Sequence, residues 1–144
     1  MTKPALSVAT VLIQFACIIY LILDGSFLAS SPIWLGMQII GVALGLWAMF
    51  VMRRFNVAPD PLEDATLITR GPYRWIRHPM YSALLLVAAG AVLHHSTPVR
   101  ITVLSMLLVN LIVKLRHEEK LMSQKFAEYQ KYIRNTKRLI PFLF

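Results

Sequence analysis

The chain has 144 residues, of which 57% are hydrophobic and 15% are charged, and its formal net charge is +8. This composition is too apolar for a soluble domain of that size, so it predicts one small integral membrane domain over residues 1 to 144. The basic residues flank apolar segments and form no soluble basic face, which argues against a nucleic-acid partner and favours anionic membrane lipids.

The first two apolar segments are residues 5 to 23 and residues 32 to 52, and neither contains a charged residue. Each is close to the roughly 20 residues that a helix needs to cross the hydrocarbon core. The second segment contains Gly41 and Gly45, with Gly36 about one turn earlier, so its small-residue stripe would let another helix approach closely. The stripe predicts either packing within the bundle or a dimer contact.

The third apolar segment, residues 80 to 93, is short for a span. It either extends through the uncharged residues 94 to 97 to complete a crossing or is re-entrant. The fourth segment, residues 99 to 113, follows Thr97 and Pro98, an N-cap hydroxyl and a proline suited to the first helical position. The sequence therefore predicts an all-α bundle of about four transmembrane helices, with the third and fourth forming a helical hairpin.

The connection before the third segment contains two local signals. Asp60, Pro61 and Glu63 resemble the start of a short helix, with the aspartate as N-cap and the glutamate at the third position. Gly71-Pro72 then predicts a turn that returns the chain to the membrane surface.

Positive charge sets the expected orientation. In the four-segment arrangement, 14 of the 15 basic residues lie on one side and only Arg100 lies on the other. The positive-inside rule therefore predicts that both termini and the loop of residues 53 to 78 are cytoplasmic. The membrane would be the inner membrane if the source is bacterial.

A dense polar and aromatic run precedes the third segment: Gly71-Pro72-Tyr73-Arg74-Trp75-Ile76-Arg77-His78-Pro79-Met80-Tyr81. Pro79 suits the first helical position, so His78 lies near the N-cap. Free N–H groups at that helix end favour an anion, and Arg74 and Arg77 could add bidentate donors to it. The alternative is that the arginines bind lipid phosphate while the aromatic residues form an interfacial belt.

A second constellation follows the fourth segment. Two adjacent carboxylates, Glu118 and Glu119, oppose the helix macrodipole unless the helix continues beyond them. Apolar residues recur at helical spacing after them and predict a C-terminal amphipathic helix at the cytoplasmic face. This stripe consists of Met122, Phe126, Tyr129 and Ile133.

Asn110, Lys114 and Glu118 share one face of the predicted fourth helix. Polar residues within a membrane are costly, so this face is a functional hypothesis. The alternative is a simple ion pair between Lys114 and Glu118. The sequence contains no zinc signature, so no metal site is predicted.

Together these residues form an ordered pattern: Arg77-His78-Pro79-Met80-Tyr81, then Glu118-Glu119, then Phe126-x-x-Tyr129-x-x-Tyr132 and Arg138-x-Ile140-Pro141. The pattern resembles the isoprenylcysteine carboxyl methyltransferase family, and the related phospholipid N-methyltransferases share parts of it. The resemblance covers roughly residues 35 to 144.

The resemblance implies a small helical membrane methyltransferase that uses S-adenosylmethionine without a Rossmann domain. Its cofactor would lie between the last transmembrane helices and the C-terminal segment, at the cytoplasmic face. The implied cofactor-binding residues are Tyr73, His78, Pro79, Tyr81, Glu118 and Glu119. The implied catalytic residues are Arg74 and Arg77, which would bind a carboxylate, and Glu119, which with Glu118 is a candidate base for an amine.

The sequence departs from the family pattern at Ala83, where a glycine is frequent, and the added methyl group is expected to narrow the approach of the helix to the cofactor. Gly90 matches a small position of the pattern. The expected acceptor is a lipophilic molecule that enters between helices: an isoprenylcysteine-type carboxylate, a thiol or a lipid amine. The alternatives are an NADPH-dependent membrane reductase related to sterol reductases, or a non-enzymatic lipid-binding or transport bundle.

Overall fold

The computed structural model describes residues 3–25, 27–52, 67–141 and 143–144. Within these residues the secondary structure is helical, as predicted, apart from one isolated bridge between Ile76 and Lys137. The elements are α1 (Lys3–Leu23), α2 (Pro32–Met52), the 3₁₀ turn η1 (Gly71–Arg74), α3 (Pro79–His94), α4 (Pro98–Lys125) and α5 (Tyr129–Asn135). The predicted helix start at Asp60, Pro61 and Glu63 lies outside the described residues.

Three helices in the described part of the chain, α1, α2 and α4, are long and apolar enough to cross a membrane. They fit a multi-pass membrane protein. The third predicted segment forms α3, one continuous helix of 16 residues, which corresponds to a length of about 24 Å. Since a typical hydrocarbon core is about 30 Å thick, a fourth full crossing stays a prediction.

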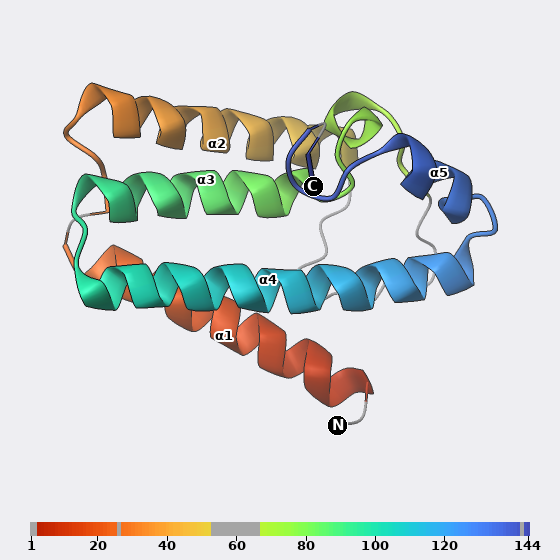
Figure 1. Ribbon diagram of the computed structural model, residues 1–144, viewed down its shortest axis with the longest axis horizontal. Coiled ribbons are helices and arrows are strands. Elements are labelled where there is room, and N and C mark those ends of the chain that lie inside the picture. Colours follow the sequence, from red (N-terminus) through yellow and green to blue (C-terminus); the bar gives the residue numbers. More distant parts are fainter. Residues whose placement is uncertain (1–2, 26, 53–66, 142) are drawn as a thin grey trace.

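The helices are arranged as two neighbouring pairs (Figure 1). α2 lies along α3, while α1 crosses α4 obliquely. A short connection joins α3 to α4, and the two helices run antiparallel as the predicted hairpin. The hydroxyl of Thr97 accepts a hydrogen bond from the amide of Arg100 at 3.2 Å, which confirms the predicted N-cap of α4.

The glycine stripe of α2 packs against α3 within the bundle. A Cβ atom at Gly41 would lie 2.9 Å from the carbonyl oxygen of Ala83, and one at Gly45 would lie 3.3 Å from the Ala83 Cβ. At Gly36 such an atom would meet nothing within 4 Å. Two of the three glycines therefore allow the close approach of α2 and α3, as expected for intramolecular packing.

Polar side chains link α1 to α4 in the bundle interior. Asn110 donates a hydrogen bond to the carbonyl of Thr10 at 2.9 Å, and Lys114 donates to the side-chain oxygen of Gln14 at 2.7 Å. The Lys114 ammonium thus binds α1, a partner that the sequence did not suggest.

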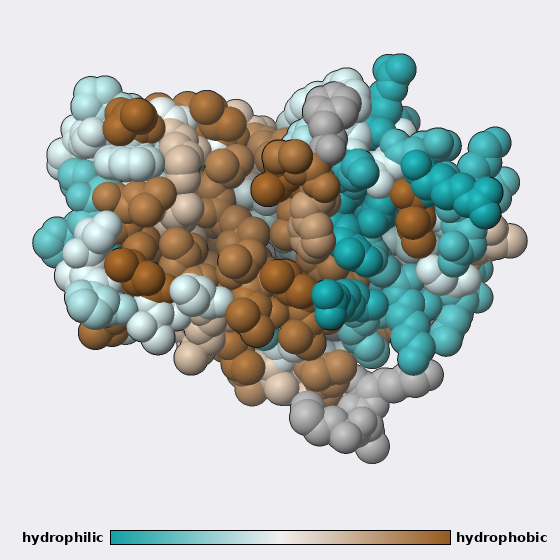
Figure 2. Space-filling view, in the orientation of Figure 1, coloured by the Kyte–Doolittle hydropathy of each residue, from teal (hydrophilic) through white to brown (hydrophobic). Residues whose placement is uncertain are grey.

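The helix after Glu118 and Glu119 continues as predicted, but only to Lys125. Phe126 has extended backbone angles, φ −118° and ψ 116°, so it ends α4. The prediction that the apolar stripe lies on one continuous helix is therefore wrong, because Tyr129 and Ile133 belong to the separate helix α5. On the face of the molecule shown in Figure 2, the middle is apolar, and the end with α5 and the last turns of α4 is polar.

Candidate functional site

The polar run before α3 begins with a tight turn. Gly71 has a φ of +61°, and a Cβ atom there would lie 2.6 Å from a methyl carbon of Val51. Two features therefore favour glycine at position 71: the left-handed backbone and the close contact with α2. The predicted Gly71-Pro72 turn is confirmed, and it directs the following residues toward the start of α3.

The C-terminal segment pairs with this run through backbone hydrogen bonds. The amide of Arg77 donates to the carbonyl of Lys137 at 2.7 Å, and the amide of Lys137 donates to Trp75 at 3.0 Å. The amide of His78 donates to the carbonyl of Arg138 at 3.0 Å. One turn into α3, the hydroxyl of Ser82 donates to the carbonyl of Leu139 at 2.6 Å. These bonds close the C-terminal segment over the N-terminus of α3.

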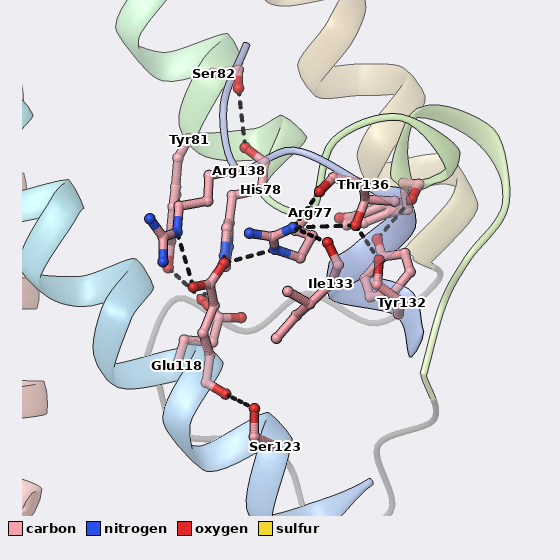
Figure 3. A network of polar contacts seen from close by, with 12 residues as sticks. Arg77, His78, Tyr81, Ser82, Glu118, Ser123, Tyr132, Ile133, Thr136 and Arg138 are labelled. Atoms are coloured by element: carbon pink, nitrogen blue, oxygen red, sulfur yellow. Dashed lines mark hydrogen bonds and ion pairs between the residues drawn. The ribbon is translucent and has the colours of Figure 1, made fainter. Parts of the chain in front are cut away.

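Arg77 and Glu119 form a buried ion pair beneath this closure (Figure 3). The Arg77 Nε donates to Glu119 at 2.7 Å, and its Nη1 donates to the carbonyl of Ile133 at 3.2 Å and to Thr136. The second Glu119 oxygen accepts from Arg138 at 3.0 Å. Only 6% of the Arg77 side chain and 9% of the Glu119 side chain are exposed. In this structure the anion that Arg77 binds is therefore Glu119.

His78 and Tyr81 lie beside the neighbouring carboxylate. Their rings stack with centroids 5.3 Å apart and an interplanar angle of 3°. The Tyr81 hydroxyl donates to Glu118 at 3.0 Å. The His78 Nδ1 lies 3.6 Å from Glu118, and its buried Nε2 lies 3.4 Å from Glu119 without hydrogen-bond geometry. The Glu118 side chain is 30% exposed, so it is the carboxylate that a ligand can reach.

Tyr73 completes the cluster from η1. Its side-chain oxygen is buried and has no hydrogen-bond partner among the described residues, while its carbonyl accepts from the Tyr132 hydroxyl at 2.6 Å. Burial, then the negative charge of Glu118 and the Tyr132 phenol, raise the pKa of Tyr73 above its usual value. Tyr73 therefore stays protonated and offers a free donor near Glu118.

The sequence-derived site residues divide into two groups. Arg77, His78 and Tyr81 come together with the two glutamates, Tyr73 is linked to the same cluster through Tyr132, and Pro79 is the first residue of α3. Arg74 is exposed and lines a cleft of about 330 Å³ together with Glu128 and Lys131. Tyr132 and Thr136 of the buried network also line this cleft.

Two further results come from the three-dimensional arrangement. A Cβ atom at Gly45 would lie 3.3 Å from the Ala83 Cβ, so the Ala83 methyl group faces α2, and the expected narrowing of a cofactor approach stays a prediction. Arg138 and Thr136 take part in the buried network, although neither was predicted as a site residue. Arg138 belonged to the recognised pattern and could have been found from it, whereas no local signal distinguishes Thr136.

An apolar groove of about 710 Å³ adjoins the polar cluster. Ile76 and Ser82, which flank Arg77, His78 and Tyr81 in the chain, line it together with residues of α2, α4 and the C-terminal segment. The other main lining residues are Trp47, Leu85, Leu108, Ile112 and Phe144. A pocket of this size is typical of sites for small organic molecules.

Comparison with known proteins finds one matching family model and two curated relatives. Residues 30–129 match the family described as phospholipid methyltransferase. The chain is 30% identical over 125 residues to the cobalt-zinc-cadmium resistance protein CzcN of Cupriavidus metallidurans, which covers 82% of the chain and 53% of that protein. It is 29% identical to the nickel-cobalt-cadmium resistance protein NccN of Alcaligenes xylosoxydans xylosoxydans, covering 82% of the chain and 54% of that protein. The chain thus spans about half the length of these curated relatives.

Proposed function

Because the chain belongs to the phospholipid methyltransferase family, we propose that it is an integral membrane methyltransferase that uses S-adenosylmethionine to methylate a lipophilic acceptor. The observation that carries the proposal is that neighbouring residues of the chain belong to two different environments. His78 and Tyr81 belong to a polar cluster with Glu118, while Ile76 and Ser82 line an apolar groove. A charged cofactor and an apolar acceptor need these two environments side by side.

The residues of the cluster fit the amino-acid end of this cofactor, which carries both an ammonium and a carboxylate. The Tyr73 hydroxyl is a buried atom without a hydrogen-bond partner in the described structure, so it has capacity for a ligand. The His78 ring lies between the two carboxylates, with its Nδ1 3.6 Å from Glu118 and its Nε2 3.4 Å from Glu119. The Glu118 carboxylate is the accessible acceptor for an ammonium. We therefore assign cofactor binding to Tyr73, His78, Tyr81 and Glu118.

The bound cofactor supplies an activated methyl group on a sulfonium. The protein then has to align the acceptor with that group and exclude water. A carboxylate or thiolate acceptor needs no general base, whereas an amine has to lose a proton. Both oxygens of Glu119 already bind arginines, so this carboxylate is not available as a base for an amine. Glu119 and Arg77 act as positioning residues that hold the C-terminal segment in place.

We assign the acceptor to the apolar groove. Its walls come in part from α2 and α4, which are long and apolar enough to cross a membrane, and its volume of about 710 Å³ suits the reactive end of a lipid or a prenylated molecule. The residues that line the groove carry no charge, so they favour a hydrophobic acceptor.

Binding of S-adenosylhomocysteine to the detergent-purified protein tests the cofactor assignment. We expect binding by calorimetry, no competition by NADPH, and a loss of affinity of about tenfold or more in His78→Ala and in Glu118→Ala. The matched control is His95→Ala, an exposed histidine after the other end of α3. Absence of binding, or unchanged affinity in both site variants, would refute the proposal.

A further inference from the structure

Lys114 is a buried cation that the proposed reaction does not use. Only 1% of the residue is exposed, although it lies in the apolar helix α4. A buried ammonium is costly unless it is well bonded, so its environment indicates a role. Its hydrogen-bond partner is the side-chain oxygen of Gln14 on α1, at 2.7 Å.

The Lys114 ammonium also faces the candidate site. It lies 5.4 Å from the centroid of the Tyr81 ring, within the range of a cation–π interaction. The same ring stacks on His78, and its hydroxyl donates to Glu118. A continuous series of contacts therefore leads from Gln14 through Lys114 and Tyr81 to the residues assigned to the cofactor.

We propose that Gln14 and Lys114 are positioning residues of the cofactor site, and this inference rests on the proposed function. Gln14 holds the ammonium over the Tyr81 ring, and the ammonium fixes that ring in the orientation that stacks on His78 and binds Glu118. α1 lies outside residues 30–129, the part that matches the family. The first helix thus contributes to a site whose other members lie in the family region and the C-terminal segment.

Docking of α1 on α4 by itself does not require this contact. Asn110, one turn earlier on α4, already bonds to the Thr10 carbonyl at 2.9 Å. The buried residues Cys17 and Leu21 of α1 pack with Leu107 and Leu111 of α4. The Gln14 and Lys114 pair adds a cation beside an aromatic ring of the site, which an apolar pair of similar size would not supply.

Two measurements on the full-length protein in detergent test the inference. Calorimetry gives the affinity for S-adenosylhomocysteine, and fluorine NMR of fluorotyrosine-labelled protein reports on the Tyr81 ring without any ligand, its resonance being assigned with Tyr81→Phe. We expect Gln14→Leu and Lys114→Met to lower the affinity by about five- to tenfold and to shift or broaden the Tyr81 resonance.

Two variants serve as controls. Thr10→Val removes a buried hydroxyl one turn earlier on α1 and should leave both measurements unchanged. Gln14→Glu keeps an acceptor for Lys114, so its affinity for S-adenosylhomocysteine and its Tyr81 resonance should stay close to those of the wild type. An unchanged Tyr81 resonance in Gln14→Leu and Lys114→Met would overturn the inference, as would an equal shift in Thr10→Val. If the wild-type protein does not bind S-adenosylhomocysteine, the proposed function fails, while the resonance still decides the positioning role.

Discussion

Glu118 and Glu119 are neighbours in the chain with different surroundings. Glu119 accepts hydrogen bonds from Arg77 and Arg138, and 9% of its side chain is exposed. Glu118 accepts from Tyr81 and is 30% exposed. Breaking a buried ion pair leaves an uncompensated charge, whereas changing a partly exposed carboxylate does not. One residue therefore stabilises the site, and the other is available to a ligand.

This difference predicts opposite effects of two matched substitutions. Glu119→Gln should destabilise the protein by about 3 kcal/mol, because Arg77 stays buried without its counter-charge. Glu118→Gln should leave the melting temperature in detergent nearly unchanged and lower the affinity for S-adenosylhomocysteine. Glu128→Gln, an exposed carboxylate, is the control for both measurements. Equal melting temperatures for the two site variants would contradict the division of roles.

At the scale of elements, the position of α3 depends on how closely α2 approaches it. Both Gly41 and Gly45 face α3 and both lie close to Ala83, while Gly41 also lies close to Leu86 and Val87. The first turn of α3 carries Tyr81 and follows directly on His78. Packing between α2 and α3 therefore sets the position of the candidate site relative to the groove, although the glycines themselves carry no chemistry.

The same stripe provides a matched pair of glycine substitutions. Gly41→Ala would place a methyl carbon 2.9 Å from the Ala83 carbonyl and from a Val87 methyl group, so it should destabilise the bundle by about 1–3 kcal/mol. Gly36→Ala meets nothing within 4 Å and gains helix propensity, so its melting temperature should equal or exceed that of the wild type. A melting temperature for Gly41→Ala at or above that of Gly36→Ala would show that the helices do not pack this way.

At the scale of the whole molecule, polar groups gather at one end. α5 and the last turns of α4 form this end, while the middle of the molecule is apolar (Figure 2). At the other end the buried Arg100 side chain lies 3.5 Å from Asp24, so the one basic residue predicted outside the cytoplasm has an acidic neighbour. The two ends thus differ in their content of basic residues, which is the difference that the positive-inside rule uses.

Single-cysteine labelling tests the predicted orientation. Cys17 is the only cysteine of the chain and is buried, so the wild-type protein should not react with an impermeant thiol reagent. Lys131→Cys at the polar end should react in inverted membrane vesicles, and Ser96→Cys, after α3, should react in right-side-out vesicles. Both positions are exposed. Reaction of both variants from the same side would exclude the proposed crossing of the membrane.

Local composition and residue spacing were sufficient to predict that the chain is a helical membrane protein. Uncharged stretches near 20 residues predict membrane helices wherever they occur, and the caps at Thr97 and Gly71-Pro72 depend on nearby residues alone. The pattern from Arg77 to Pro141 likewise identified the family. These properties are encoded within short stretches of chain, so the sequence by itself determined them.

The roles within each polar segment depended on the tertiary structure. Neighbouring residues of a helix point about 100° apart, so packing alone decides whether Glu118 or Glu119 meets an arginine. Packing also decides that Arg77 is buried while Arg74 is exposed. Ala83 faces α2 because α2 approaches that side of α3. The contact from Gln14 to Lys114 joins residues 100 positions apart. Such contacts form only when the helices assemble, so the tertiary structure decided them.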